Sequence, residues 1–361
     1  MSDRIKSLAQ QEIDWTYLVE LARWNGVTPL LHRSLTAACA DAVPEAILKD
    51  LADHCRRNVI RSLLMTAELL KLLELFDAHG IQAIPFKGPV LAASAYGDVA
   101  LREFCDLDIL IRKRDLRRTR NLLVAQGYKS YRWNLERPDC GLTVELHWWE
   151  FPQSGISCPD DRRDVWDRRN AVSLLGSTVP ALAPEDTLLA LYTHGSRHCW
   201  DRLTLVCDLA QFISTQPQMD WTRVLERATK TGTRRRLLWG LLLAGDLLGV
   251  PVPPEVSALA ADDRRVMALV GDARRRILSP PSAAFGNVES WASQLRAMER
   301  LRDRIRFCLD LLLEGFRPNK TDRHVVPLPR CLHVLYYVIR PIRMAVTYGP
   351  RAVRHLVRRS S

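Results

Sequence analysis

The spacing of apolar side chains changes twice along this sequence, and these changes constrain the fold more than any other feature. Before about residue 80 and after about residue 160, apolar residues recur at helical intervals. Between these points, short apolar runs alternate with brief helical patterns, in the order strand, helix, strand, helix and return strand. This order predicts a small α+β unit between two helical parts of the chain.

Helical patterns dominate both flanks of this unit. Trp15–Trp24 has helical apolar spacing, and His54–His79 carries an apolar stripe that stops at Gly80. The strongest helical runs after the unit are Glu185–His198, Leu203–Thr215, Arg234–Leu248, Asp262–Leu278 and Glu289–Gly315.

The middle unit contains three predicted strands. They lie in the runs IQAIPFKG from Ile81, DLDILI from Asp106 and TVELHWW from Thr143. A short helix beginning at Pro89 follows the first strand, and a helix over Arg114–Gln126 follows the second. We expect four parts of the chain, namely an N-terminal helical segment (1–80), an α/β core (81–155), a larger helical domain (156–316) and a C-terminal tail (317–361).

The positive charge of the chain lies mostly in the tail. The formal net charge is +11, which is typical of nucleic-acid-binding proteins when the charge covers the body. Residues 317–361, however, hold ten basic residues and one acidic residue, which leaves +2 for the rest of the chain. The near-neutral body argues against a nucleic-acid partner, and we expect none.

Composition and the cysteine pattern indicate a globular protein of a reducing compartment. With 47% hydrophobic and 26% charged residues, the chain is neither disordered, collagen-like nor a membrane bundle. The nine cysteines form no Cys-x-x-Cys pair, the N-terminus has no apolar signal region, and no apolar run is long enough to span a membrane. We therefore expect a cytoplasmic protein.

Two pairs of polar side chains lie on neighbouring predicted strands. Asp106 and Asp108 are two residues apart, so both project from the same face of their strand. Glu145 and His147 repeat this spacing on a later strand. Three carboxylates on adjacent strands suit Mg²⁺, which prefers oxygen ligands, and could support metal-assisted transfer of a phosphoryl or nucleotidyl group. The alternative is a solvated strand edge with a chance Asp-x-Asp spacing.

Basic residues and a glycine precede the first carboxylate. Lys87 and Gly88 lie where the first strand turns into the short helix, and a glycine at such a turn lets backbone N–H groups approach a phosphate. The Lys87 ammonium could reach that phosphate, and Arg102, four residues before Asp106, could do the same. This combination favours the metal-site interpretation.

With these residues in place, the chain resembles the uncharacterised nucleotidyltransferase family of bacteria, part of the DNA polymerase β-like superfamily. KGPVLAASAYGDVALREFCDLDILI and the later VELHWW carry the resemblance. Three further runs resemble other segments of the family: LARWNGVTPLLHRSL, HGSRHCWDRLTLVCDLAQFI and LPRCLHVLYYVIRPIR. The resemblance covers most of the chain.

The resemblance implies a small mixed sheet flanked by helices, with Mg²⁺ as cofactor and a nucleoside triphosphate as donor. Mn²⁺ is the alternative cation. Asp106 and Asp108 match the paired metal ligands of the superfamily, and Glu145 takes the place of its third carboxylate. Gly88 matches the glycine of the phosphate turn. The superfamily usually has Gly-Ser or Gly-Gly there, whereas this chain has Lys87-Gly88-Pro89.

Histidines form the remaining candidate site residues. His194 and His198 are four apart on a predicted helix and therefore share a face. They could line the acceptor cleft, pair with Asp208 or bind Zn²⁺, although no third zinc ligand is evident. His147 could orient Glu145, contact substrate or form only a local hydrogen bond.

These observations predict a Mg²⁺-dependent nucleotidyltransferase that acts on an unidentified small molecule, peptide or glycan. Alternatives are a non-catalytic scaffold module of a biosynthetic assembly and a toxin-like enzyme that modifies tRNA or protein. The tail over 317–361 is both apolar and basic, so it could contact the inner membrane surface peripherally, dock on an acidic protein or pack on the body.

Overall fold

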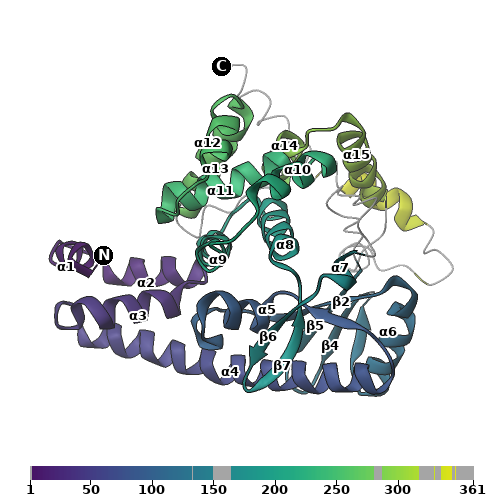
Figure 1. Ribbon diagram of the computed structural model, residues 1–361, viewed down its shortest axis with the longest axis horizontal. Coiled ribbons are helices and arrows are strands. Elements are labelled where there is room, and N and C mark those ends of the chain that lie inside the picture. Colours follow the sequence, from purple (N-terminus) through teal and green to yellow (C-terminus); the bar gives the residue numbers. More distant parts are fainter. Residues whose placement is uncertain are drawn as a thin grey trace.

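A computed structural model describes residues 2–131, 133–148, 164–279, 287–316, 329, 335–343 and 346. Its architecture is α+β, with one mixed five-stranded sheet, a separate hairpin and many helices (Figure 1). The small mixed sheet between helical parts that the sequence predicts is confirmed. The four-part division of the chain stays a prediction.

The N-terminal helices end in one long helix that supports the sheet. The bounds in this part are α1 (Ser2–Ala9), α2 (Trp15–Trp24), α3 (Thr28–Cys39) and α4 (Glu45–Ala78). Helix α4 begins nine residues before the predicted His54 and ends at the predicted place, where Gly80 has a positive φ of 64°. Its buried side chains include Leu69, Leu72 and Phe76, which pack on the sheet.

The sheet has the strand order β1-β2-β5-β4-β3, and the central pair β2 and β5 is parallel. The strands are β1 (Ala83–Pro85), β2 (Asp106–Ile111), β3 (Lys129–Tyr131), β4 (Asn134–Arg137) and β5 (Leu142–His147). The sequence patterns predicted β1, β2 and β5 but not β3 and β4, which are short and largely polar. Between the strands lie α5 (Gly88–Leu91), η2 (Ala92–Tyr96), η3 (Val99–Leu101), η4 (Lys113–Asp115) and α6 (Leu116–Ala125).

The two faces of β2 have different neighbours. Leu107, Ile109 and Ile111 point into the core shared with α4, so the alternate residues Asp106 and Asp108 project from the opposite face. Helix α8 (Pro184–Arg197) lies on that opposite side of the sheet (Figure 1). The fold thus places the carboxylates under a helix that comes from much later in the chain.

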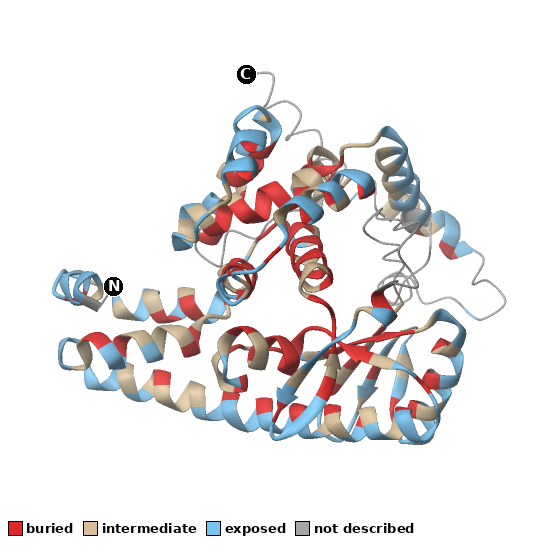
Figure 2. Cartoon of the chain, viewed as in Figure 1, coloured by how far each residue is buried: buried red, intermediate tan, exposed pale blue. Residues whose placement is uncertain are grey.

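A second core holds the helices that follow the sheet, and Figure 2 shows α8 and α11 as its most buried members. The remaining helices are α7 (Asp164–Asp167), α9 (Leu203–Ser214), α10 (Trp221–Thr231), α11 (Arg234–Leu248), α12 (Pro254–Ala261), α13 (Arg264–Ile277), α14 (Asn287–Ala297) and α15 (Leu301–Phe316). Trp200 and Trp239 are fully buried at the centre of this core. The predicted helices at α8, α9, α11 and α13 are confirmed to within a few residues.

One hairpin departs from the purely helical pattern expected after residue 160. Strands β6 (Asn170–Leu174) and β7 (Ser177–Ala181) pair antiparallel around the two-residue turn Leu175-Gly176. Both turn residues have positive φ, 49° and 84°, as the tightest hairpin turns require. In the sequence, Gly176 was the residue that could have indicated this hairpin turn. Leu175 hid the turn, because leucine is unusual at a position with positive φ.

The predicted single helix over Glu289–Gly315 is wrong, because the structure has two helices, α14 and α15, separated at residues 298–300. Hydrogen bonds from within the segment and from outside it stabilise the break. The Arg304 guanidinium donates to the Met298 carbonyl at 2.8 and 3.0 Å, and the Glu299 carboxylate accepts the backbone N–H of Arg234. These hydrogen bonds replace the helical ones that the apolar periodicity predicts.

In the described part of the chain, no helix combines the length and the apolar character that crossing a membrane requires. Most of the predicted basic tail lies outside the described residues.

The packing around Trp200 leads to a stability prediction. A Cβ atom at Gly240 would lie 2.5 Å from the Trp200 ring and 2.8 Å from Leu209, and both side chains are buried. We expect Gly240→Ala to lower the free energy of unfolding by about 1–3 kcal/mol through overpacking. Gly271→Ala is the matched control, because its Cβ would meet only the Arg275 guanidinium at 3.7 Å. Urea denaturation should show the control unchanged or stabilised, and equal effects of the two substitutions would contradict this account of the core.

Candidate active site

The register between β2 and β5 brings the predicted carboxylates together. Asp108 is paired with Glu145, and Leu110 with His147, across the parallel strands. Because alternate residues share a face, Asp106, Asp108, Glu145 and His147 all project from the side opposite α4. The local sequence explains the placement, since the intervening residues of both strands are apolar and buried.

Asp108 is the most deeply buried of these carboxylates and has two polar partners. The Lys87 ammonium lies 2.9 Å from its Oδ1, and His147 Nε2 donates to the same oxygen at 2.7 Å. Burial alone would raise the pKa of Asp108, but Lys87 and His147 outweigh it and hold the pKa far below the usual range. Asp108 is therefore ionised at any physiological pH.

Asp106 and Glu145 are more accessible than Asp108, and the charges around them differ from those around Asp108. Burial raises the pKa of Asp106, and the negative charge of Asp108 raises it further. Glu145 accepts a hydrogen bond from the Asn134 amide at 3.0 Å and lies 3.6 Å from His147 Nε2. The carboxylates thus repel one another, and a bound cation would relieve this repulsion.

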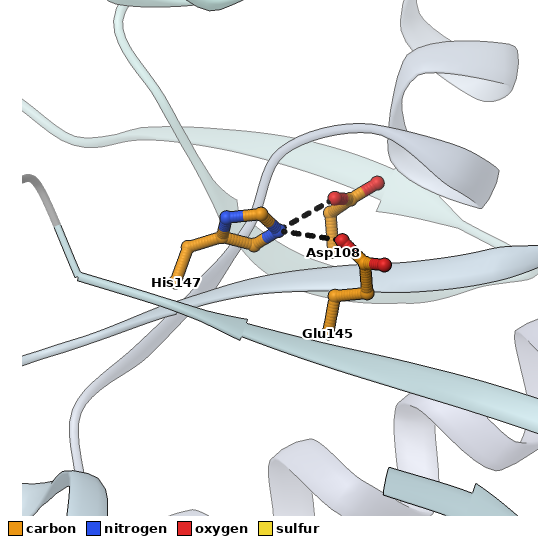
Figure 3. A group of neighbouring side chains, drawn as sticks. All are labelled: Asp108, Glu145 and His147. Carbon is orange, nitrogen blue, oxygen red and sulfur yellow. Dashed lines mark hydrogen bonds and ion pairs between the residues drawn. The ribbon is translucent and has the colours of Figure 1, made fainter. Parts of the chain in front are cut away.

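Three of these side chains could hold a metal ion. One ligand atom each of Asp108, Glu145 and His147 lies within 4.8 Å of the others (Figure 3). Two carboxylate oxygens and an imidazole nitrogen are donors that suit Mg²⁺ or Mn²⁺, with the nitrogen better matched to Mn²⁺. Among the described residues, Asp106 belongs to no such set of three, although it projects from the same face as Asp108. The structure thus groups His147, predicted as a substrate contact, with two of the predicted metal ligands.

The turn after β1 approaches the carboxylates closely. Gly88 has a positive φ of 53°, and a Cβ added to it would lie 3.2 Å from the backbone oxygen of Asp106. A side chain at this position would be strained and would press on the strand that carries the carboxylates. The glycine is therefore required here by backbone conformation and by close approach.

Arg102 joins two parts of the fold. Its guanidinium donates to both carboxylate oxygens of Asp208 on α9, each at 2.8 Å, and the pair is buried. Tyr96 donates to the same carboxylate at 2.8 Å. Because Asp208 engages two of its nitrogens, Arg102 is positioned as a link between the α/β core and the helices rather than as a free phosphate ligand.

Helix α8 covers the site and brings His194 to Lys87. Lys87 Nζ lies 3.5 Å from His194 Nδ1, and the His194 and His198 rings are 4.6 Å apart. Burial and the nearby Lys87 hold the pKa of His194 well below its usual value, and burial and Arg197 lower that of His198 to about 4. Neither histidine pairs with Asp208, which is bound by Arg102 and Tyr96.

A small pocket lies between the ends of β1 and β5 and helix α8. Its lining residues are Phe86, Lys87, His147, Ala190, Thr193, His194 and Arg197. Lys87, His147 and His194 were predicted as site residues from the sequence, whereas Thr193 and Arg197 were not. The sequence spacing could have identified both residues. Thr193 and Arg197 are four apart on a predicted helix, and His194 is three residues before Arg197, so each pair shares a helical face.

Comparison with known proteins places this geometry in context. A family model described as uncharacterised nucleotidyltransferase matches residues 11–249. No protein of curated function matches the sequence significantly.

Solved structures give only low similarity. A crystal structure of an antigenic nucleotidyltransferase-like protein from Paracoccidioides brasiliensis is 16% identical with a TM-score of 0.31, over 46% of this chain and 87% of that one. The solution structure of the antibiotic-resistance factor ANT(2'')-Ia is also 16% identical, with a TM-score of 0.28 over 60% of this chain and 94% of that one. At these scores neither likeness supports an argument about this chain.

Breaking the buried pair between Arg102 and Asp208 should be costly. We expect Arg102→Leu to lower the free energy of unfolding by about 3–5 kcal/mol, because it leaves Asp208 as an uncompensated buried charge. The double variant Arg102→Leu/Asp208→Leu should recover much of this loss. Arg56→Leu, which breaks an exposed pair with Asp53, is the control and should change stability by less than about 1 kcal/mol. A similar small effect at Arg102 in urea denaturation would refute the proposed link.

The neutral His194 should make stability depend on pH. Below about pH 6.5 the unfolded chain takes up a proton at His194 that the folded protein excludes, so the free energy of unfolding falls as pH falls. We expect His194→Gln to reduce the slope of stability against pH between about pH 6.5 and 5, relative to the exposed control His79→Gln. Urea denaturation at several pH values measures both slopes, and identical slopes would contradict the prediction.

Proposed function

Because the chain belongs to the uncharacterised nucleotidyltransferase family, we propose that it is a metal-dependent nucleotidyltransferase. In the proposed reaction an acceptor oxygen or similar group forms a bond to the α-phosphorus of a nucleoside triphosphate. The bond from that phosphorus to the bridging oxygen breaks, and pyrophosphate leaves. The acceptor, the preferred base and the identity of the cation are open, with Mg²⁺ and Mn²⁺ as the candidates.

The observation that carries this proposal is the clustering of Asp108, Glu145 and His147 beside Lys87 and the Gly88 turn. A cation held by Asp108 and Glu145 would neutralise charge on the transferred phosphate. We assign Asp106 to the same cation as a further ligand, since it projects from the same face of β2. His147 is a ligand or an orienting group for Asp108, to which it donates a hydrogen bond.

The remaining roles follow from position and charge. Gly88 lets backbone N–H groups approach the triphosphate, and Lys87, its neighbour, offers a positive charge there. Glu145 is more exposed than Asp108 and can accept the proton of the attacking group. His194 and His198, held neutral on α8, are proposed to contact the acceptor.

Arg102 has a positioning role in this proposal. Its bond to Asp208 fixes the segment before β2 against α9, and thereby fixes the distance between α8 and the carboxylates. Donor binding therefore rests on Lys87 and Gly88.

We predict that the isosteric substitution Asp108→Asn weakens metal-dependent nucleotide binding by at least about 100-fold, because a charged ligand becomes neutral while its shape is kept. Calorimetric titration of ATP, CTP, GTP and UTP with Mg²⁺ or Mn²⁺ measures the effect. Asp139→Asn is the matched control, since that carboxylate is exposed and pairs with Arg137. A scaffold protein would bind no nucleotide in a metal-dependent way, and unchanged binding by Asp108→Asn would overturn the assigned metal site.

A further inference from the structure

The pocket under α8 contains polar groups that the proposed metal chemistry does not use. Arg197 and Thr193 enter it from the helix, beside Lys87 and His147 from the sheet. Phe86 and Ala190 supply its apolar wall. The pocket therefore has the composition of a site for a small group, with a few polar residues on an apolar surface.

The hydroxyl of Thr193 is buried without a hydrogen-bond partner. The side chain is 3% exposed, and its Oγ1 atom has no hydrogen-bond partner among the residues that the structure describes. A threonine within a helix commonly donates to the carbonyl four residues before it, but Thr193 does not. A buried hydroxyl without a partner is unfavourable, so a ligand that accepts its hydrogen bond would gain from this site.

Arg197 brings a positive charge to the pocket. Within the part of the chain that the structure describes, no carboxylate lies within ion-pair distance of its guanidinium, and its one side-chain hydrogen-bond partner there is His198 at 3.5 Å. Several other half-buried arginines of the fold pair with carboxylates, as Arg227 does with Asp186. Arg197 thus has the planar donor groups that recognise phosphate and carboxylate, and they remain available.

The other charges around the pocket leave this positive charge in excess. Lys87 and Asp108 neutralise each other at 2.9 Å. Glu145 is directed to Asn134 and His147, and it is not among the lining residues. The charges of the lining residues therefore sum to a net positive charge, which favours binding of an anion.

We propose that the pocket lined by Thr193 and Arg197 binds an anionic group, phosphate or carboxylate, of a substrate. This inference rests on the proposed function only in calling the ligand a substrate of the neighbouring carboxylate site. Arg197 forms a charge-assisted hydrogen bond to the anion, and Thr193 donates from its hydroxyl. The anion has two sources, the polyphosphate of the donor nucleotide or an acidic group on the acceptor.

The first experiment tests the pocket without metal or nucleotide. Inorganic phosphate is titrated calorimetrically into the full chain in a metal-free buffer. We expect Arg197→Gln to weaken binding by about 10–100-fold, and Thr193→Val by about 3–10-fold, as expected for the loss of a charged and a neutral hydrogen bond. Arg274→Gln is the control, because Arg274 is largely exposed on α13, and it should bind phosphate as the wild type does.

Thr193→Val also separates a binding role from a structural one. Valine has the same shape and removes a hydroxyl that the free protein leaves without a partner, so the melting temperature should stay the same or rise while phosphate binding weakens. A variant that loses stability instead would show that the hydroxyl serves the fold. Wild-type protein that binds no phosphate, or Arg197→Gln that binds it as tightly, would overturn the proposal.

The second experiment identifies the source of the anion. If Arg197→Gln weakens binding of the metal–nucleotide complex, the pocket holds the donor polyphosphate. If nucleotide binding is unchanged and the nucleotide-saturated wild type still binds phosphate, the pocket holds an acidic group of the acceptor. Asp108→Asn removes the charge that neutralises Lys87, so it should keep or strengthen phosphate binding while losing metal-dependent nucleotide binding. Failure of the pocket and failure of the catalytic proposal therefore give different results.

Discussion

The buried ion pair between Arg102 and Asp208 is the interaction on which the rest of the arrangement depends. It joins the segment that leads into β2 to helix α9, and Tyr96 completes the network from the end of the short helix. Hydrophobic contacts alone would allow the helices to slide over the sheet, whereas a two-pronged hydrogen bond fixes one geometry. Helix α8, packed on α9, is thereby held over the carboxylates.

Electrostatics divide the site below α8 into two regions. On the sheet, Asp108 is neutralised by Lys87 and His147, while Asp106 and Glu145 add negative charge beside it. On the helix, Arg197 adds positive charge, and desolvation together with neighbouring cations lowers the pKa of both histidines. A cation on the first region and an anion on the second would compensate each other across a short distance, which is the charge pattern of a metal–phosphate reaction.

Much of this site followed from residue spacing, and the exceptions have physical reasons. Alternation on β2 and β5 was enough to place Asp108, Glu145 and His147 on one face. A shift by one residue would turn the apolar side chains of the strand away from the core, which is unfavourable. The partner of Arg102 could not be deduced, since it lies on a helix far along the chain and its identity depends on tertiary packing. Strand β3 and the hairpin turn at Leu175 lacked the expected residue types, and the break after α14 depends on hydrogen bonds from Arg304.

The order of synthesis gives the Arg102–Asp208 pair a further consequence. Asp208 follows Arg102 by 106 positions, so the whole sheet leaves the ribosome before the carboxylate that neutralises this arginine has been made. During that interval the guanidinium must stay hydrated, and the surface that will meet α9 stays open to solvent. The nascent α/β core therefore holds the carboxylates of the proposed metal site uncovered, and the finished enclosure forms only when the first helices of the second core arrive.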